Sequence, residues 1–276
     1  ADTGVGDSPE GAILLDGQPV KLADHSALAL CLRIGLLANE SDVYEEEGRY
    51  RADGDPTEAA LIVAAMKGGL HREHELLVYP LLDEIPFESD RQYMATLHGH
   101  DGERLIFVKG APEKILAMCQ TAYTGSTTAL DRHSIVRASH ELASEGLRVL
   151  AMAYRPAAPG VDEIDDRDLE AGLIFVGLQG MIDPPRPEAT AAVAACKRAG
   201  IRVVMITGDH RVTAEAIARR MGIIPESGAR VLDGRELEAM DDEELFALVK
   251  QVSVYARAAP QHKLRIVQQF RRHGEV

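Results

Sequence analysis

The sequence lacks the features that mark a disulfide-rich, membrane-spanning or nucleic-acid-binding chain. Its three cysteines, Cys31, Cys119 and Cys196, are scattered without CxxC spacing, so we expect reduced core residues and no metal site. No apolar run could span a bilayer and no signal peptide opens the chain, so the polypeptide itself is expected to be soluble and not membrane-inserted. A net charge of −14 argues against nucleic acid as a partner.

The length and the composition describe a globular chain of about two domains. The chain has 276 residues, of which 46% are hydrophobic, as is ordinary for proteins with a real core. Acidic residues are concentrated in the segments 42–47 and 162–170. We expect both segments to be solvated loops.

Helix and strand patterns are mixed in the first two thirds of the chain. Asp55-Pro56-Thr57-Glu58 has the form of a helix start, with Asp55 as the cap and Glu58 closing a capping box. His100-Asp101-Gly102 is typical of a hairpin turn. The elements predicted here are helices at 24–37, 56–67 and about 130–145, a short helix opened by Pro112, and strands at 92–98, 103–109, 147–154 and 173–178. This pattern predicts an α+β domain in which helices flank an antiparallel sheet.

A stiff connector separates this part from a more regular one. Pro184, Pro185 and Pro187 follow Asp183 within four residues and can continue neither a strand nor a helix. We therefore place the domains at 1–182 and 183–276. The later elements are helices at 188–199, 211–221, 242–250 and 260–272 and strands at 201–206 and 252–256, which predict an α/β fold with a parallel sheet. Two strands are few for a sheet, so we expect this second domain to be incomplete.

Thr207-Gly208-Asp209 lies where the 201–206 strand ends and a helix pattern begins. At that edge of an open α/β sheet ligands bind, and a helix N-terminus favours an anion such as phosphate. The alternative is an ordinary turn with Asp209 as a helix cap. Lys263 lies in the first turn of the helix opened by Pro260, where a cation costs about 0.3–1 kcal/mol unless an anion is near.

Three residues of the first domain have both a structural and a functional interpretation. Lys109-Gly110 lies between a strand and a helix start, where a lysine can hold a phosphate, although solvated strand-end lysines are more common. Phe87 follows Pro86 and is either a core aromatic or a loop ring that stacks on a flat base. Glu58 either closes the capping box or has a role in a site.

Five motifs decide between these readings by resemblance. In their order and spacing they are similar to the large cytoplasmic loop of P-type cation-transporting ATPases, and the resemblance covers nearly the whole chain. The motifs are Asp55-Pro56-Thr57-Glu58-Ala59-Ala60-Leu61, Pro86-Phe87-Glu88-Ser89-Asp90-Arg91, Phe107-Val108-Lys109-Gly110-Ala111-Pro112-Glu113, Met181-Ile182-Asp183-Pro184-Pro185-Arg186 and Tyr255-Ala256-Arg257-Ala258-Ala259-Pro260-Gln261-His262-Lys263.

The resemblance implies a nucleotide-binding domain joined to an incomplete haloacid-dehalogenase-like, Rossmann-like domain. It implies that Phe87 stacks on adenine, that Lys109 lines the pocket, that Glu58 lies near the adenine amino group and that Arg148 reaches the phosphates. Ser89 and Gln92 stand where the calcium-pump version has basic residues. We therefore expect a weak hold on ATP, with Arg91 as a candidate to compensate in part.

The same resemblance implies a phosphoryl site in the second domain. Lys263 matches a lysine that contacts the phosphorylated aspartate, Thr207 binds the same phosphoryl group, and Asp183 and Asp209 lie at its edge. Arg257 and His262 are further candidates, each with a structural alternative. The predicted catalytic residues are Thr207, Lys263 and Asp209, and the predicted nucleotide-binding residues are Thr57, Glu58, Phe87, Lys109, Gly110, Arg148, Asp183, Arg186, Gly208 and Arg257.

Two motifs of the family are absent from these 276 residues. There is no Asp-Lys-Thr-Gly-Thr with its acceptor aspartate, and Gly-Asp-Gly-Val-Asn-Asp, which helps to hold Mg²⁺, would be expected just past Val276. We expect the chain to bind ATP with its Mg²⁺ and not to turn it over. The resemblance implies a parent pump that is an integral membrane protein, with this segment on the cytoplasmic side and with actuator and transmembrane domains as partners.

Two other functions remain as alternatives. A soluble phosphatase of the haloacid dehalogenase type would need an Asp-x-Asp motif after an N-terminal strand, which the chain lacks, and would leave Phe87 and Lys109 without a role. A nucleotide sensor unconnected with transport has no separate support. The first-domain loops resemble the calcium/sodium/proton branch, since the His-Pro dipeptide of the heavy-metal branch does not occur. The transported ion cannot be read from this segment.

Overall fold

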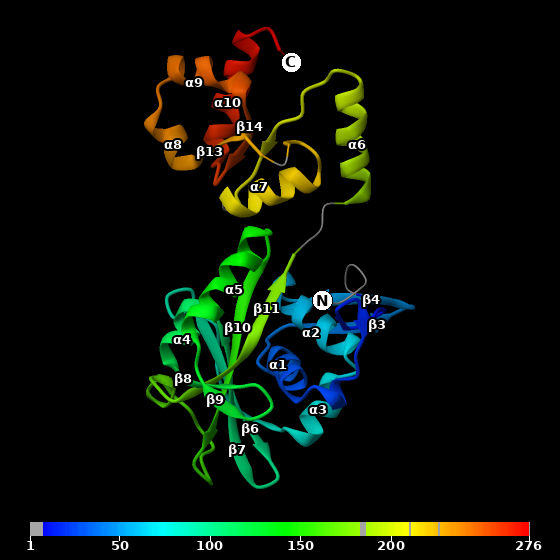
Figure 1. Ribbon diagram of the computed structural model, residues 1–276, viewed down its shortest axis with the longest axis vertical. Coiled ribbons are helices and arrows are strands. Elements are labelled where there is room, and N and C mark those ends of the chain that lie inside the picture. The colour runs from blue at the N-terminus through cyan, green and yellow to red at the C-terminus, as the bar shows by residue number, and fades with distance from the viewer. Residues whose placement is uncertain (1–7, 183–185, 210, 226, 276) are drawn as a thin grey trace. The chain divides into compact units, whose positions relative to one another are not determined.

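A computed structural model describes residues 8–182, 186–209, 211–225 and 227–275 (Figure 1). The chain divides into two compact units, Ala1–His140 with Val149–Met181, and Glu141–Arg148 with Ile182–Val276. The predicted domains, 1–182 and 183–276, stay a prediction. Within the described residues no helix combines the length and the apolar character needed to cross a bilayer.

A seven-stranded sheet in the order β5-β6-β7-β10-β11-β8-β9 organises the first unit. Its strands are β5 (Leu81–Ile85), β6 (Tyr93–His100), β7 (Glu103–Gly110), β8 (Cys119–Tyr123), β9 (Thr127–Ala129), β10 (Arg148–Ala157) and β11 (Leu173–Met181). The predicted antiparallel pairing holds for β5-β6, β6-β7, β7-β10 and β8-β9, but β11 pairs with β8 in parallel. The sheet is therefore mixed. Helix α4 (Pro112–Met118) connects β7 to β8, which lies beyond the positions of β10 and β11 in the strand order.

The predicted hairpin is β6 and β7. The register pairs His100 with Glu103 at one end and Tyr93 with Gly110 at the other. Asp101 and Gly102 join the strands with φ values of 48° and 83°. These left-handed values are those of the tight turn whose twist matches a two-stranded ribbon, and asparagine, aspartate and glycine tolerate them best.

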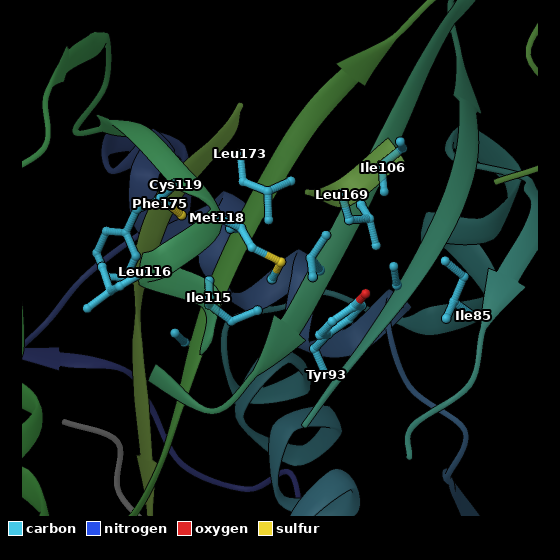
Figure 2. Packing of buried hydrophobic residues seen from close by; sticks show 14 of the residues in the cluster. Ile85, Tyr93, Ile106, Ile115, Leu116, Met118, Cys119, Leu169, Leu173 and Phe175 are labelled. Carbon is cyan, nitrogen blue, oxygen red and sulfur yellow. The ribbon is translucent and has the colours of Figure 1, made fainter. Parts of the chain in front are cut away.

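The two faces of this sheet are covered by different helices. Alternation along β7 places Phe107 and Lys109 on one face and Ile106 and Val108 on the other. The Phe107 face packs against α1 (Ser26–Leu37) and α2 (Pro56–Lys67) through residues such as Ile34 and Leu61. The opposite face packs against α4 and the turn η2 (Asp166–Leu169). Figure 2 shows this second core, in which Tyr93, Ile106, Ile115, Met118, Leu169 and Leu173 meet.

One expected loop is a strand. Asp42–Glu46 forms β3 and pairs antiparallel with β4 (Arg49–Asp53). The charges of this segment hid an alternation in which Val43 and Tyr50 face a small core shared by α1 and α2. The chain also forms β1 (Leu14–Leu15), β2 (Gln18–Pro19), η1 (Leu22–Asp24), α3 (Arg72–Val78) and α5 (Arg132–Ser144). The second acidic segment, expected to be a loop throughout, contains η2.

The second unit has the predicted parallel α/β arrangement with one additional strand, and the strand predicted at 201–206 is shorter, with only its last two residues in β12. Its described strands, in the order β12-β14-β13, are β12 (Met205–Ile206), β13 (Arg230–Asp233) and β14 (Val252–Ala256), and both pairs are parallel. The four residues of β13 are too short a signal to be read from periodicity. The helices are α6 (Pro187–Arg198), α7 (Arg211–Arg220), α8 (Gly234–Ala239), α9 (Asp242–Leu248) and α10 (Pro260–Arg272), with the turn η3 (Val249–Gln251).

Candidate functional site

The strand ends that carry Phe87 and Lys109 lie at the same end of the seven-stranded sheet. β5 ends at Ile85, opposite Ala95, and β7 ends at Gly110, opposite Tyr93. Because β6 runs antiparallel to both neighbours, the last residues of β5 and β7 flank its beginning. Phe87 follows β5 by two residues and Lys109 is the penultimate residue of β7. The topology therefore brings two predicted site residues, 22 positions apart in sequence, to the same end of the sheet.

Lys109 is a buried cation with a single close counter-charge. Its side chain lies on the face covered by α1 and α2, and the residue is 3% exposed. Nζ lies 2.6 Å from Oε1 of Glu58 on α2. Apart from this ion pair, Nζ has no hydrogen-bond partner among the described residues. Burial lowers the pKa of Lys109, and the nearby carboxylates of Glu58 and Glu40 oppose the shift.

The Glu58 carboxylate is held by the loop of residues 39–41, which is not among the predicted site residues. Asp55 caps α2 as predicted, because its side chain accepts from the amides of Thr57 and Glu58. Glu58 Oε2 instead accepts from the amide of Glu40 at 3.0 Å and from Ser41 Oγ at 3.2 Å. The Asp55 amide, which a capping box would pair with Glu58, donates to Ser41 Oγ at 2.9 Å. Glu58 is thus turned toward Lys109 rather than closing the box.

Phe87 is not a core residue. It is 46% exposed, whereas the other four phenylalanines are buried or half-buried. Its loop is held by Arg91, which donates to the carbonyl oxygen of Pro86 at 2.9 Å and forms an ion pair with Asp166 at 3.1 Å. An exposed ring on a pinned loop can stack on a flat ligand. Arg91 was expected to compensate for missing phosphate contacts, but its guanidinium is engaged with Pro86 and Asp166.

Close packing at Gly110 leaves no room for a side chain. A Cβ there would lie 2.4 Å from the carbonyl oxygen of Gln92. Gln92 itself has a left-handed φ of 63°, and its carbonyl accepts from the amide of Ala111 at 2.9 Å. Glycine at 110 therefore lets the start of β6 approach the end of β7. The predicted contact of Gly110 with nucleotide stays a prediction.

Four more predicted residues lie at helix or strand starts or beyond the described parts. Thr57 is in the first turn of α2 and is half-buried. Arg148 is exposed and is the first residue of β10, where the division between the two units falls. Arg186 is the exposed residue that precedes α6. Asp183 lies outside the described residues.

In the second unit two loops meet at the carboxyl edge of the parallel sheet. Thr207 Oγ1 donates to Asp209 Oδ2 at 2.7 Å and accepts from the Asp209 amide at 3.1 Å. Arg257, with a left-handed φ of 47°, donates its amide to the carbonyl of Asp209, and the Ala258 amide donates to the carbonyl of Thr207, both at 2.9 Å. Thr207, Gly208, Asp209 and Arg257 are therefore brought together at the edge where ligands of such sheets bind.

A third loop at the same edge was missed by the sequence analysis. Gly234 follows β13, and a Cβ there would lie 2.3 Å from the carbonyl oxygen of Arg257. His262 takes its structural alternative, because it is buried and its Nδ1 accepts from the amide of Ala259 at 3.2 Å. Lys263 is exposed in the first turn of α10. The sequence signals for this strand-to-helix junction were Gly234 and the capping box formed by Asp233 and Glu236.

The family comparison decides the classification. Residues 27–188 match the family described as P-type ATPase, cytoplasmic domain N. The chain belongs to the P-type ATPase family. Residues 115–267 also match the haloacid dehalogenase-like hydrolases, in agreement with the predicted fold of the second domain. A stand-alone phosphatase of that type would not explain the P-type match across the first unit.

Three curated P-type relatives are similar over most of this chain. A Synechocystis protein named cation-transporting ATPase pma1 is 46% identical over 96% of the chain and 29% of its own length. The calcium-transporting ATPase of Bacillus subtilis is 39% identical over 99% of the chain and 31% of its own length. The probable cation-transporting ATPase F of Mycobacterium tuberculosis is 41% identical over the same shares. The chain therefore spans about a third of the length of the relatives it matches.

Proposed function

We propose that this chain is the ATP-binding segment, with part of the phosphorylation site, of a P-type ATPase that couples ATP hydrolysis to cation transport. The observation that carries the proposal is the Lys109 ammonium, which is buried, is paired with Glu58 and has no further hydrogen-bond partner among the described residues. Its unused N–H groups are a source of attraction for an anionic ligand. Phe87 at the same end of the sheet offers the exposed ring that a nucleotide base would need.

The two groups supply different parts of the binding free energy. The Phe87 ring provides an apolar stacking surface for adenine. Lys109 provides positive charge in a site of low dielectric constant, where it acts more strongly than in water. Arg148, Arg186, Thr57 and Gly110 are proposed as further nucleotide contacts. Burial of Lys109 means that its ion pair with Glu58 has to adjust as the ligand enters, which favours a modest affinity.

The edge of the second unit is proposed as the place where the phosphoryl group is held. Thr207 and Gly208 offer a hydroxyl and an amide, and Arg257 and Lys263, which follow β14, offer positive charge. Mg²⁺ carried with ATP would neutralise phosphate charge. In this proposal, as the family resemblance implies, the protein ligands of that metal lie outside these residues.

The activity of the parent, its partners and its location belong to this proposal. The parent would form an aspartyl phosphate on an aspartate outside these residues, and its actuator and transmembrane domains would be the partners of this segment on the cytoplasmic side of a membrane. Two of the similar proteins carry names for cation transport and one for calcium transport. These names support a cation pump and leave the ion open.

Titration calorimetry with ATP tests the nucleotide site. We expect a dissociation constant of roughly 0.1–1 mM, or about 4–5.5 kcal/mol of binding free energy. Phe87→Ala should abolish measurable binding, and Lys109→Met should weaken it at least about tenfold. Tyr44→Ala is the matched control, because Tyr44 is an aromatic of nearly equal exposure, 45%, on β3. Equal binding of ATP and GTP, together with an unchanged Phe87→Ala variant, would show that the pocket is misassigned.

A further inference from the structure

Ser41 lies between α1 and β3 and has a hydroxyl that joins two groups of the candidate site. The residue is 2% exposed. Its Oγ accepts from the Asp55 amide at the start of α2, and two acceptors lie within reach of its proton, Oε2 of Glu58 at 3.2 Å and the Asp55 carbonyl oxygen at 3.4 Å. A serine hydroxyl has one proton and two acceptor lone pairs. The carboxylate that faces Lys109 is the nearer and the charged acceptor, so it is the stronger of the two.

The backbone around Ser41 is held from three helices. Arg72 at the start of α3 donates to the carbonyl oxygens of Asn39 and Ser41. The Asn39 amide group donates to Gly35 O in α1 and to Glu58 O in α2, both at 2.9 Å. The Ser41 amide donates to Asn39 Oδ1 at 2.9 Å. Such a network holds the backbone of residues 39–41, and with it the position of Ser41 Oγ beside Glu58.

The space beside Ser41 is also limited. Gly54, just before the helix cap, has a left-handed φ of 108°, and a Cβ there would lie 2.3 Å from Ser41 Oγ and 3.0 Å from Ser41 Cα. The backbone of Gly54 thus packs directly on the serine. Any side chain at 41 much larger than serine would have to displace this segment.

We propose that Ser41 is a positioning residue of the nucleotide site. Glu58 has two carboxylate oxygens, of which Oε1 faces Lys109 and Oε2 is held by Ser41 and by the Glu40 amide. Fixing Oε2 fixes the orientation of Oε1, and hence the position of the Lys109 ammonium. This inference rests on the proposed function, since it concerns how the same site is held before a nucleotide arrives.

The charged groups that act on the Lys109 ammonium are Glu58 on α2, Glu40 in the loop after α1, and Arg72 on α3. The two carboxylates favour the charged form of Lys109, and Arg72 opposes it. Without the Ser41 hydroxyl, Glu58 loses one of the two groups that hold Oε2. The carboxylate then samples other orientations, and its stabilisation of the ammonium weakens.

The test combines nucleotide affinity with the titration of Lys109. In Ser41→Ala we expect ATP affinity to fall about threefold to tenfold, as for the loss of one hydrogen bond. We also expect the Lys109 pKa, followed by NMR of labelled lysine without nucleotide, to move further down. Ser41→Cys, which has a similar volume and a weak donor, should lie between the parent and Ser41→Ala in both measurements. Ser134→Ala is the control, since Ser134 also hydrogen-bonds a carboxylate, that of Asp131, at the surface near α5.

The outcomes separate this inference from the proposed function. A folded Ser41→Ala chain with unchanged Lys109 titration and unchanged ATP affinity overturns the role of Ser41, while Phe87→Ala and Lys109→Met can still support the site. If the chain without substitutions does not bind ATP, the proposed function fails, and the Lys109 titration still reports on Ser41. Should Ser41→Ala not fold, Ser41→Cys, with a similar volume and a weak donor, is measured in the same way and read by the same two results.

Discussion

The ammonium nitrogen of Lys109 on β7 lies 2.6 Å from a carboxylate oxygen of Glu58 on α2. Both side chains are largely removed from water. A buried pair of this kind contributes little net stability, but the loss of one member leaves an uncompensated charge. The pair therefore links α2 to β7. The effects of substituting Glu58 and Lys109 on the free energy of unfolding should not be additive.

Glu58→Gln should destabilise the first unit by about 3 kcal/mol, because Lys109 would remain buried without its counter-charge. The double variant Glu58→Gln/Lys109→Met should lose less than the sum of the two single variants. Urea unfolding followed through the amide signals of β7 measures both effects. Additive losses would mean that the two groups do not interact in solution.

The first unit should lose stability as the pH falls below 6.5, the ordinary pKa of histidine, because His98 is buried in its neutral form. His98 is fully buried, its Nδ1 donates to the carbonyl of Tyr79 and its Nε2 accepts from Thr96 Oγ1. Burial lowers the pKa of His98 from 6.5 to about 4, with Arg72 adding to the shift. The unfolded chain then binds the proton more readily, so stability is fully present above pH 6.5 and is lost as the pH falls toward 4.

This loss should reach up to about 3 kcal/mol. Unfolding free energies of the parent chain and of His98→Asn at pH 7.5 and pH 5.0 provide the comparison. The difference between the two pH values should shrink in the variant. An equal pH dependence in both proteins would assign the effect to other groups.

Gly234→Ala should disturb the second unit. The added Cβ would meet the Arg257 carbonyl oxygen at 2.3 Å, and backbone cannot yield as a flexible side chain can. We expect a loss of about 2–4 kcal/mol, seen as faster amide exchange in β13 and β14. Gly208→Ala is the control, because nothing lies within 4 Å of a Cβ at Gly208. Unchanged exchange in Gly234→Ala would contradict the close packing of these loops.

The three cysteines should react at very different rates. Burial raises the pKa of the Cys31 and Cys119 thiols to about 12, whereas Cys196 is half-buried. At pH 8 the two buried thiols should be alkylated at least roughly a hundredfold more slowly than Cys196. Mass spectrometry after timed iodoacetamide exposure gives the rates, with urea-unfolded protein as the reference. Comparable rates in the folded protein would show that these cores open readily.

These 276 residues should form no phosphoenzyme from ATP, even with millimolar Mg²⁺. Thr207 and Lys263 can hold a phosphoryl group, but an acyl phosphate needs a carboxylate in line with the γ-phosphorus. The family's acceptor motif is absent from the sequence, and Asp209 already accepts from Thr207. Incubation with γ-labelled ATP and acid quenching should leave no hydroxylamine-sensitive label. A stoichiometrically labelled aspartate would contradict the prediction that these residues lack a phosphate acceptor.

Local signals in the sequence were sufficient wherever a few neighbouring residues determine the backbone. Asp55-Pro56 starts α2, Asp101-Gly102 turns the β6–β7 hairpin, and β14 and α10 lie where periodicity placed them. Caps, turns and long periodic runs act over a few residues, so the sequence contains their whole cause. The parallel second unit followed from the alternation of such elements. The family motifs added candidate roles for Phe87 and Lys109.

The tertiary structure decided which of these side chains face one another. The sequence left Glu58 either as the closing residue of a capping box or as a site residue, and only the approach of loop 39–41 turned its carboxylate toward Lys109. Gly234 and Arg257 are likewise distant in sequence and touch through their backbones. Hydrogen bonds and close packing between such segments leave no periodic or local trace, because their partners are brought together only when the sheets and helices pack. The sequence by itself determined the long periodic elements, their caps and turns, and the family, because these causes are local. The packing determined the short strands β3 and β13 and the network that holds Lys109.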